Sequence, residues 1–160
     1  MDEPRRRVME RLRAFAADYT ELTHHLAKWL GVHSADAAAF AEILYAEDKG
    51  TPLTPARLAR RIALTSGATS SLLNRLEAAD LLVRSRENAD RRVVTLRSVP
   101  SVGAQAGQFF TPLSERVDEL MDETSPEMLA EFERFLTRLH DIMLFVSDNI
   151  DDLVPPRPSG

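Results

Sequence analysis

The residues best suited to chemistry are small polar side chains on one predicted helix, spanning about residues 66–79. A helical wheel separates an apolar face with Ala68, Leu72 and Leu76 from a polar one. Small neutral groups can approach phosphates and base edges without charge repulsion or bulk, and the first turn of a helix offers free N–H groups to a phosphate. The pattern therefore indicates a surface that contacts double-stranded DNA. Its predicted members are Ser66, Gly67, Thr69, Ser70, Ser71 and Asn74.

Basic residues are concentrated in the same part of the chain. Residues 54–97 carry nine basic and four acidic residues, a formal net charge of +5, whereas residues 1–53 carry −2 and residues 98–160 carry −8. The whole-chain charge of −5 hides this positive segment, which has the size and sign expected of a nucleic-acid footprint. Two interpretations stay open for its arginines, contact with phosphates or a merely solvated surface. The arginines concerned are Arg57, Arg60, Arg61, Arg91 and Arg92.

Other chemistries find little support in the residues. The chain has no cysteine, which excludes disulfides, thiol nucleophiles and thiolate zinc sites. Glu21, His24 and His25 could be read as a metal cluster, but they flank a predicted helix interface, and a structural or solvent-facing role is the favoured reading. No nucleophile elbow or glycine-rich phosphate loop is found. We therefore expect neither catalysis, nor a cofactor, nor a metal.

The elements around this surface follow from periodicity and from capping residues. Apolar residues spaced three and four apart predict a first helix ended by Gly31 and a last helix begun by Ser125. Thr54-Pro55 predicts a helix start, and a break at 63–65 separates that helix from the polar one. The predicted order is helix 8–29, helix 34–47, helix from 54, helix 66–79, strands 81–84 and 93–96 joined as a hairpin, helix 101–123 and helix 126–153. The inward residues of helix 101–123 are predicted as Phe109, Leu113, Val117 and Leu120.

Length and composition fit this plan. The 160 residues suffice for one domain, and 44% hydrophobic residues suffice for a core. No apolar run reaches the length of a membrane span, and the first residues do not resemble a secretory signal, so a cytoplasmic location without membrane contact is expected. The two apolar seams, from Val8 to Trp29 and from Leu129 to Leu153, exceed what one small domain can bury, which predicts a homodimer.

A continuous stretch from Leu53 to Leu96 resembles the multiple-antibiotic-resistance regulator (MarR) family. The resemblance is carried by 53–55 (Leu-Thr-Pro), 58–59 (Leu-Ala), 62–68 (Ile-Ala-Leu-Thr-Ser-Gly-Ala), 74–77 (Asn-Arg-Leu-Glu), 82–84 (Leu-Val-Arg) and 90–92 (Asp-Arg-Arg). It implies a mainly α-helical fold with a small β-hairpin wing. It also implies a winged helix-turn-helix region at 53–97, flanked by dimerisation helices at 1–33 and 98–153. The proline-rich residues 154–160 are expected to form a flexible tail.

The resemblance assigns roles to single residues. Ser70 and Ser71 stand at the family's usual base-facing positions. Asn74-Arg75 stands where many members have Asp-Arg, so Arg75 is expected, like Asn74, to contact DNA. Asp90 and Arg92 match the wing pattern, in which an acidic residue orients an arginine toward the minor groove. The implied function is a sequence-specific transcriptional regulator, a repressor that binds a pseudo-palindromic operator as a homodimer. The alternative is a dimeric protein-interaction module whose winged region no longer reads DNA.

The sequence departs from the family's pattern at two positions. Many members carry a long side chain near Ser71, so shorter contacts or DNA shape would have to replace it here. Many carry glycine where Asp80 stands, but aspartate tolerates the left-handed conformation required after a helix.

The family often binds a small aromatic anion as effector. Two interpretations remain open for four aromatic residues, core packing or the lining of an effector pocket; they are Trp29, Tyr45, Phe109 and Phe110.

Overall fold

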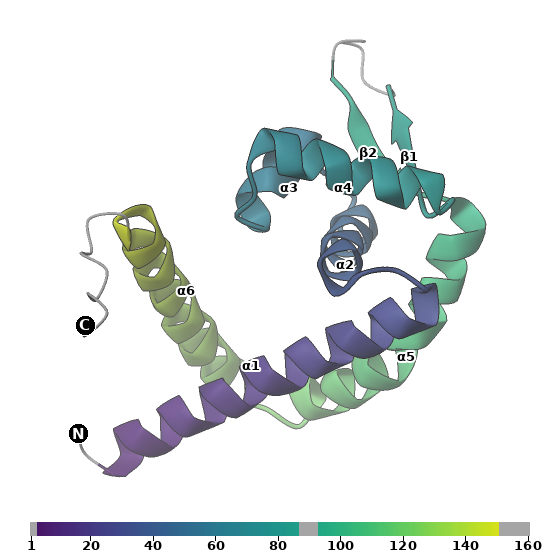
Figure 1. Ribbon diagram of the computed structural model, residues 1–160. Coiled ribbons are helices and arrows are strands. Elements are labelled where there is room, and N and C mark those ends of the chain that lie inside the picture. Colours follow the sequence, from purple (N-terminus) through teal and green to yellow (C-terminus); the bar gives the residue numbers. More distant parts are fainter. Residues whose placement is uncertain (1–2, 87–92, 151–160) are drawn as a thin grey trace, which may run out of the picture. The chain divides into compact units, whose positions relative to one another are not determined.

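The structure is a computed structural model, which describes residues 3–86 and 93–150 (Figure 1). In that part of the chain the helices are α1 (Glu3–Leu30), α2 (Ser34–Asp48), α3 (Pro55–Arg61), α4 (Ser66–Ala78), α5 (Pro100–Asp122) and α6 (Pro126–Asp148). The strands β1 (Leu82–Ser85) and β2 (Thr95–Ser98) form one antiparallel sheet between α4 and α5. The predicted fold class, mainly helical with a small hairpin, is confirmed.

The chain divides into two compact units, one ending at Phe109 and the other beginning at Phe110, with α5 running through the boundary. The core of the first unit joins α2, α3, α4, the hairpin and the start of α5. Its fully buried members include Phe40, Ile43, Leu58, Leu76 and Leu96. Burying each such side chain contributes about 1.5–3 kcal/mol, so this core holds the helix-turn-helix elements against one another.

The helix ends are formed by the residues that the sequence indicates. Gly31 adopts a φ of +70° directly after α1. The Thr54 side chain accepts a hydrogen bond from the Arg57 N–H at 3.3 Å, and the Ser125 side chain accepts one from the Met128 N–H at 3.3 Å. Each of these two caps is followed by proline in the first turn, whose missing N–H costs nothing there.

The hairpin lies two residues later in its second strand than the sequence predicts. Strand 93–96 was expected, but β2 spans Thr95–Ser98, with Leu82 opposite Ser98 and Ser85 opposite Thr95. The later register places Leu96 in the core, where its N–H donates to the Leu53 carbonyl at 2.8 Å. Apolar content alone therefore misplaced this strand.

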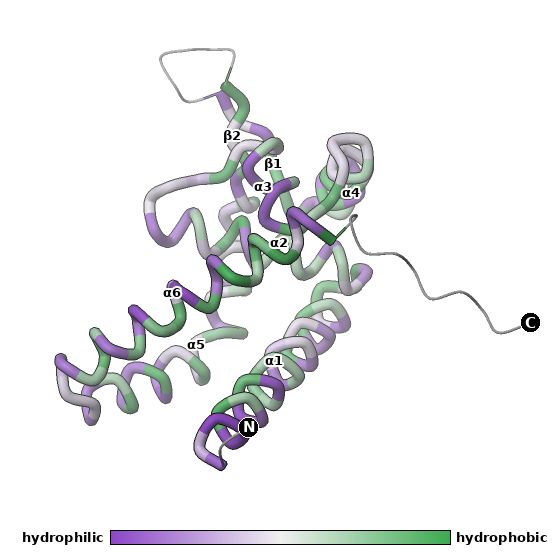
Figure 2. Tube along the Cα trace, turned by 90° about the vertical axis from the view of Figure 1, so that its left-hand side faces the viewer, coloured by the Kyte–Doolittle hydropathy of each residue, from purple (hydrophilic) through white to green (hydrophobic). Residues whose placement is uncertain are grey.

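The second unit contains the distal part of α5 and all of α6, and α6 has no buried residue. Figure 2 shows hydrophobic residues recurring along α6 between hydrophilic ones. The expectation that Leu113, Val117 and Leu120 face inward is wrong for the single chain, because all three are exposed. The last helix ends at Asp148, earlier than residue 153, which lies outside the described residues with the predicted tail. Within the described ranges no helix is both long and apolar enough to cross a membrane.

Candidate nucleic-acid interface

A short turn between α3 and α4 creates the helix-turn-helix geometry. α3 ends at Arg61, and Ala63 adopts a φ of +51° while the Leu64 N–H donates to the Ala59 carbonyl at 3.0 Å. Thr65 then caps α4 by accepting a hydrogen bond from the Ala68 N–H at 3.2 Å. Left-handed geometry at Ala63 is unusual for a residue with a β-carbon. The backbone hydrogen bond at the end of α3 and the Thr65 side-chain cap at the start of α4 hold the chain in this reversal.

The outer face of α4 presents small polar groups. Ser66, Gly67, Ser70, Ser71 and Asn74 are exposed, as predicted for a contact surface. Helical Gly67 has no heavy atom within 4 Å of the place where a β-carbon would stand. The start of α4 is therefore open to another molecule's approach.

Two residues of α4 lie on the side opposite to the predicted one. Thr69 was assigned to the DNA-contacting surface, but it is 1% exposed and its hydroxyl donates to the Thr65 carbonyl at 2.9 Å. Ala68 was assigned to the inner face and is exposed. The buried side of α4 is completed by Leu72, Leu73 and Leu76, so the inner face is rotated toward Thr69 and Leu73. Thr69 is consequently withdrawn from the contact surface.

Arg75 is held by an acid on another helix. Its Nε donates to Oδ2 of Asp36 at 2.9 Å, and its terminal NH2 group donates to Oδ1 at 2.5 Å. The hydrogen bond with Asp36 raises the pKa of Arg75 above its ordinary value, and partial desolvation opposes that effect. The predicted DNA-contacting arginine thus has a fixed orientation in the free chain. Asp36 was not singled out by sequence reasoning, because no local pattern connects residues 39 positions apart.

Arg84 on β1 connects the hairpin to α4. Its terminal NH2 group donates to Oδ1 of Asn74 at 2.9 Å and lies 3.4 Å from Oε2 of Glu77. Asn74 is therefore exposed and at the same time engaged by the wing. The sequence pointed to Arg84 only as part of the family pattern, and no role was predicted for it.

The base of the wing is also fixed to α2. Glu47 accepts a hydrogen bond from the Ser98 N–H at 3.0 Å, and its other carboxylate oxygen lies 3.8 Å from the Arg97 guanidinium. The tip residues predicted to contact DNA or to orient that contact, Asp90, Arg91 and Arg92, lie outside the described residues.

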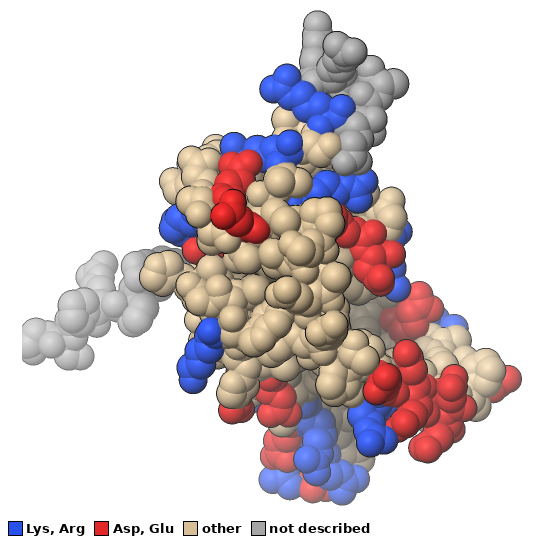
Figure 3. Space-filling model, turned by 90° about the vertical axis from the view of Figure 1, so that its right-hand side faces the viewer, with Lys and Arg blue, Asp and Glu red and all other residues tan. Residues whose placement is uncertain are grey.

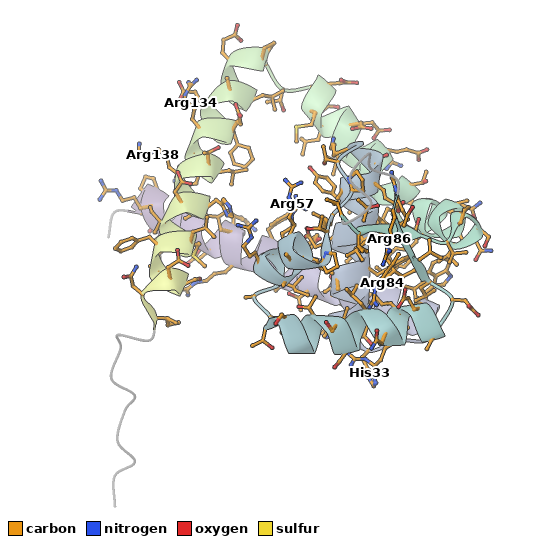
Figure 4. All side chains as sticks on the ribbon, turned by 90° about the horizontal axis from the view of Figure 1, so that it is seen from above. His33, Arg57, Arg84, Arg86, Arg134 and Arg138 are labelled. Carbon is orange, nitrogen blue, oxygen red and sulfur yellow. The ribbon has the colours of Figure 1, made fainter. Side chains whose placement is uncertain are left out.

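Exposed arginines surround the helix-turn-helix elements. Figure 3 shows basic side chains gathered at the base of the hairpin, and Figure 4 shows Arg57 apart from Arg84 and Arg86. Arg61 pairs with Glu42 at 2.9 Å, which partly neutralises it. Arg57 and Arg60 are exposed on α3.

The four aromatic residues considered for an effector pocket are placed differently from one another. Trp29 and Phe109 contact each other, with ring centroids 5.7 Å apart, and Trp29 remains 48% exposed. Tyr45 is 59% exposed, with the Lys49 ammonium 5.6 Å from its ring centroid. Phe110 begins the second unit and is partly buried. A core role fits neither Trp29 nor Tyr45.

Three of the four histidines border an open groove where α1 meets α2. Its volume is about 540 Å³, and its lining is Glu21, His24, His25, Ala27, Lys28, Gly31, Val32, His33 and Ser34. The exposed His25 Nε2 and Glu21 Oε1 atoms are 3.7 Å apart and form a weak ion pair only when the imidazole is protonated. Among the residues that the structure describes, no three such side chains are arranged to hold a metal ion.

Comparison with known proteins assigns this fold. A sequence profile of the MarR family matches residues 30–93. The chain is 30% identical over 125 residues to the uncharacterised HTH-type transcriptional regulator YcgE of Bacillus subtilis, covering 78% of this chain and 79% of YcgE. The chain belongs to the MarR family. It is accordingly a transcriptional regulator with a DNA-binding winged helix fold, in a family of regulators rather than enzymes.

Solved structures agree with the MarR assignment at the level of fold. MepR of S. aureus in its DNA-binding conformation aligns with a TM-score of 0.65 at 16% identity, covering 85% of this chain and 98% of MepR. The regulator MarR of Oenococcus oeni PSU-1 aligns with a TM-score of 0.62 at 16% identity, covering 84% of this chain and 98% of that protein.

Proposed function

We propose that this MarR-family protein is a repressor that binds a pseudo-palindromic operator as a homodimer. In this proposal α4 enters the major groove, and the hairpin wing reaches an adjacent groove or the backbone. The observation that carries the proposal is the exposed face of α4. Apart from Arg75 at its edge, the predicted contact residues that stay exposed there are short and uncharged, namely Ser66, Gly67, Ser70, Ser71 and Asn74. Such a face can reach base edges and phosphates without charge repulsion, whereas an acidic face would be repelled by the phosphates.

The dimer is supported by apolar side chains that the single chain leaves exposed. On α6 they are Met128, Phe132, Phe135, Leu136, Ile142, Met143, Leu144, Phe145 and Val146. Exposed apolar residues on this scale mark an interaction surface, because burying each side chain is worth about 1.5–3 kcal/mol. α1 and α5 contribute further exposed residues, among them Phe15, Tyr19 and Leu120. We assign 1–33 and 98–153 to dimerisation and 53–97 to DNA binding.

The test is a gel-shift titration with the DNA upstream of the protein's own gene, repeated over a salt series. Specific binding by a dimer should appear, and affinity should fall steeply between low and moderate salt, because neutralised phosphates release counterions. A promoter-reporter assay with that DNA should show lower transcription when the protein is present. A stable dimer that binds no DNA would instead support a protein-interaction module.

We further propose that a small aromatic anion acts as effector near Trp29 and Phe109. The support is the half-exposed contact between these two rings on α1 and α5. Trp29 is the chain's one tryptophan, so its fluorescence reports on this place alone. Titration with benzoate as the probe should change that fluorescence and weaken DNA binding over the same concentration range. Unchanged fluorescence at millimolar benzoate would contradict this part of the proposal.

A further inference from the structure

Asp36 is a buried carboxylate in the first turn of α2, with its side chain 3% exposed. Both of its oxygens accept hydrogen bonds from Arg75 of α4, which approaches through Nε and one terminal nitrogen. This two-point arrangement fixes the plane of the guanidinium as well as its position, which one hydrogen bond would not do. Asp36 therefore determines where the Arg75 head group lies.

The guanidinium of Arg75 has further N–H groups, on the side facing away from Asp36, that do not contact this carboxylate. A guanidinium has five N–H groups, and the contact with Asp36 employs the Nε edge. The Arg75 side chain remains 49% exposed although its partner is buried. The buried acid thus lies behind an arginine whose outer edge is accessible.

The position of Arg75 on α4 suits a phosphate better than a base. Arg75 follows Ser71 by four residues, about one helical turn, so the two residues lie on the same side of α4. Because Arg75 also reaches Asp36, it lies at the edge of this outer face that is nearer to α2. The edges of a helix in the major groove face the sugar-phosphate walls, and arginine is the usual partner of a phosphate there.

We propose that Asp36 is a positioning residue for DNA binding, whose buried carboxylate holds Arg75 with its outer N–H groups directed at a backbone phosphate. This proposal rests on the proposed DNA-binding function. A long side chain ordered before binding loses less conformational freedom when it meets DNA. The arrangement also links the angle between α2 and α4 to the placement of a phosphate contact.

The proposal predicts an effect opposite in sign to simple electrostatics. Asp36→Asn removes a negative charge near the DNA, which by itself should tighten binding. Loss of the two-point contact should instead weaken binding roughly three- to thirtyfold, the scale of one side chain's ordering. Glu42→Gln is the matched control, because Glu42 is another α2 acid paired with an arginine, Arg61, outside α4. We expect that control to bind as tightly as the unmodified protein or slightly more tightly.

A double variant distinguishes a purely structural role of the Asp36–Arg75 pair from the proposed positioning role. Asp36→Leu with Arg75→Met replaces the ion pair by apolar groups of similar volume, which often preserves stability. If the pair only joins α2 to α4, the double variant should regain both thermal stability and DNA affinity. The positioning role predicts regained stability with affinity still low, and a salt slope shallower by about 0.9 for each lost phosphate contact.

The experiment is an anisotropy titration of the full-length variants against one operator duplex at several salt concentrations, with thermal unfolding of each. If Asp36→Asn does not fold, Arg75→Lys tests the proposal in its place. Lysine keeps the positive charge beside Asp36 but cannot form the two-point hydrogen-bonded contact. The expected result for either variant is weaker binding with a near-native unfolding transition. Binding by Asp36→Asn or Arg75→Lys equal to that of Glu42→Gln would overturn the proposal. Absence of binding by the unmodified protein would instead refute the proposed function.

Discussion

Replacing Gly67 with alanine should stabilise the protein and weaken its DNA binding. Gly67 is the second residue of α4, in ordinary helical geometry, and an added β-carbon meets no heavy atom within 4 Å. Alanine in a helix is favoured over glycine by about 0.5–1 kcal/mol. For a chain of this length that gain raises the melting temperature by roughly 1–4 °C.

The expected effect on DNA binding has the opposite sign. A helix cannot satisfy the N–H groups of its own first turn, and Thr65 takes only the one from Ala68 through its hydroxyl. The N–H groups of Ser66 and Gly67 can therefore serve a phosphate, provided that the backbone comes close to it. A methyl group there should cost one charge-assisted hydrogen bond, about 1.5–3 kcal/mol, or roughly 10- to 150-fold in affinity.

Circular dichroism melts and anisotropy titrations of Gly67→Ala measure both effects. Gly107→Ala is the matched control, because Gly107 also lies in a helix with open space around the added β-carbon. We expect the control to gain similar stability with unchanged DNA affinity. If Gly67→Ala binds DNA as tightly as the unmodified protein, the start of α4 does not approach the DNA backbone.

Four further substitutions test the dimer interface, the end of α4 and the tip of the wing. Leu139→Glu places a charge in the apolar seam of α6 and should dissociate or unfold the proposed dimer; sedimentation showing an unchanged dimer would contradict the assigned interface. Asp80→Gly should raise stability by about 0.5–1 kcal/mol, because Asp80 has a φ of +53° after α4 and its charge opposes the helix dipole; a lower unfolding temperature would refute this reasoning. Asp90→Ala should weaken DNA binding although it removes a negative charge, and Arg92→Ala should weaken it most for A·T-rich flanks; tighter binding by Asp90→Ala would exclude an orienting role.

Local signals predicted the framework of this fold. Thr54-Pro55, Ser125-Pro126 and Gly31 mark helix ends through their own conformational preferences, so the structure confirms all three. Asp80 takes the left-handed conformation that its position required. These features depend on a few neighbouring residues and can be derived without knowing the tertiary fold.

Contacts between elements could not be predicted in the same way. Periodicity indicated that α4 has an inner face, but small residues left its rotation uncertain, and Thr69 was placed on the wrong side. Nothing local connects Asp36 to Arg75 or Arg84 to Asn74, because each pair is joined only when separate elements pack. Apolar seams likewise showed that α5 and α6 have a face to bury, without showing that the single chain leaves it exposed.

Selection of bound sequences from a random duplex library is the most direct test of sequence readout by α4. If α4 of each protomer reads DNA, the selected duplexes should converge on an inverted repeat whose half-sites are separated by about one helical turn, roughly 10 base pairs. Ser70→Ala and Ser71→Ala should change the preferred bases within each half-site, since both side chains are exposed on the outer face of α4. A bound pool with no enriched motif, or a motif that neither substitution alters, would contradict sequence readout by this helix.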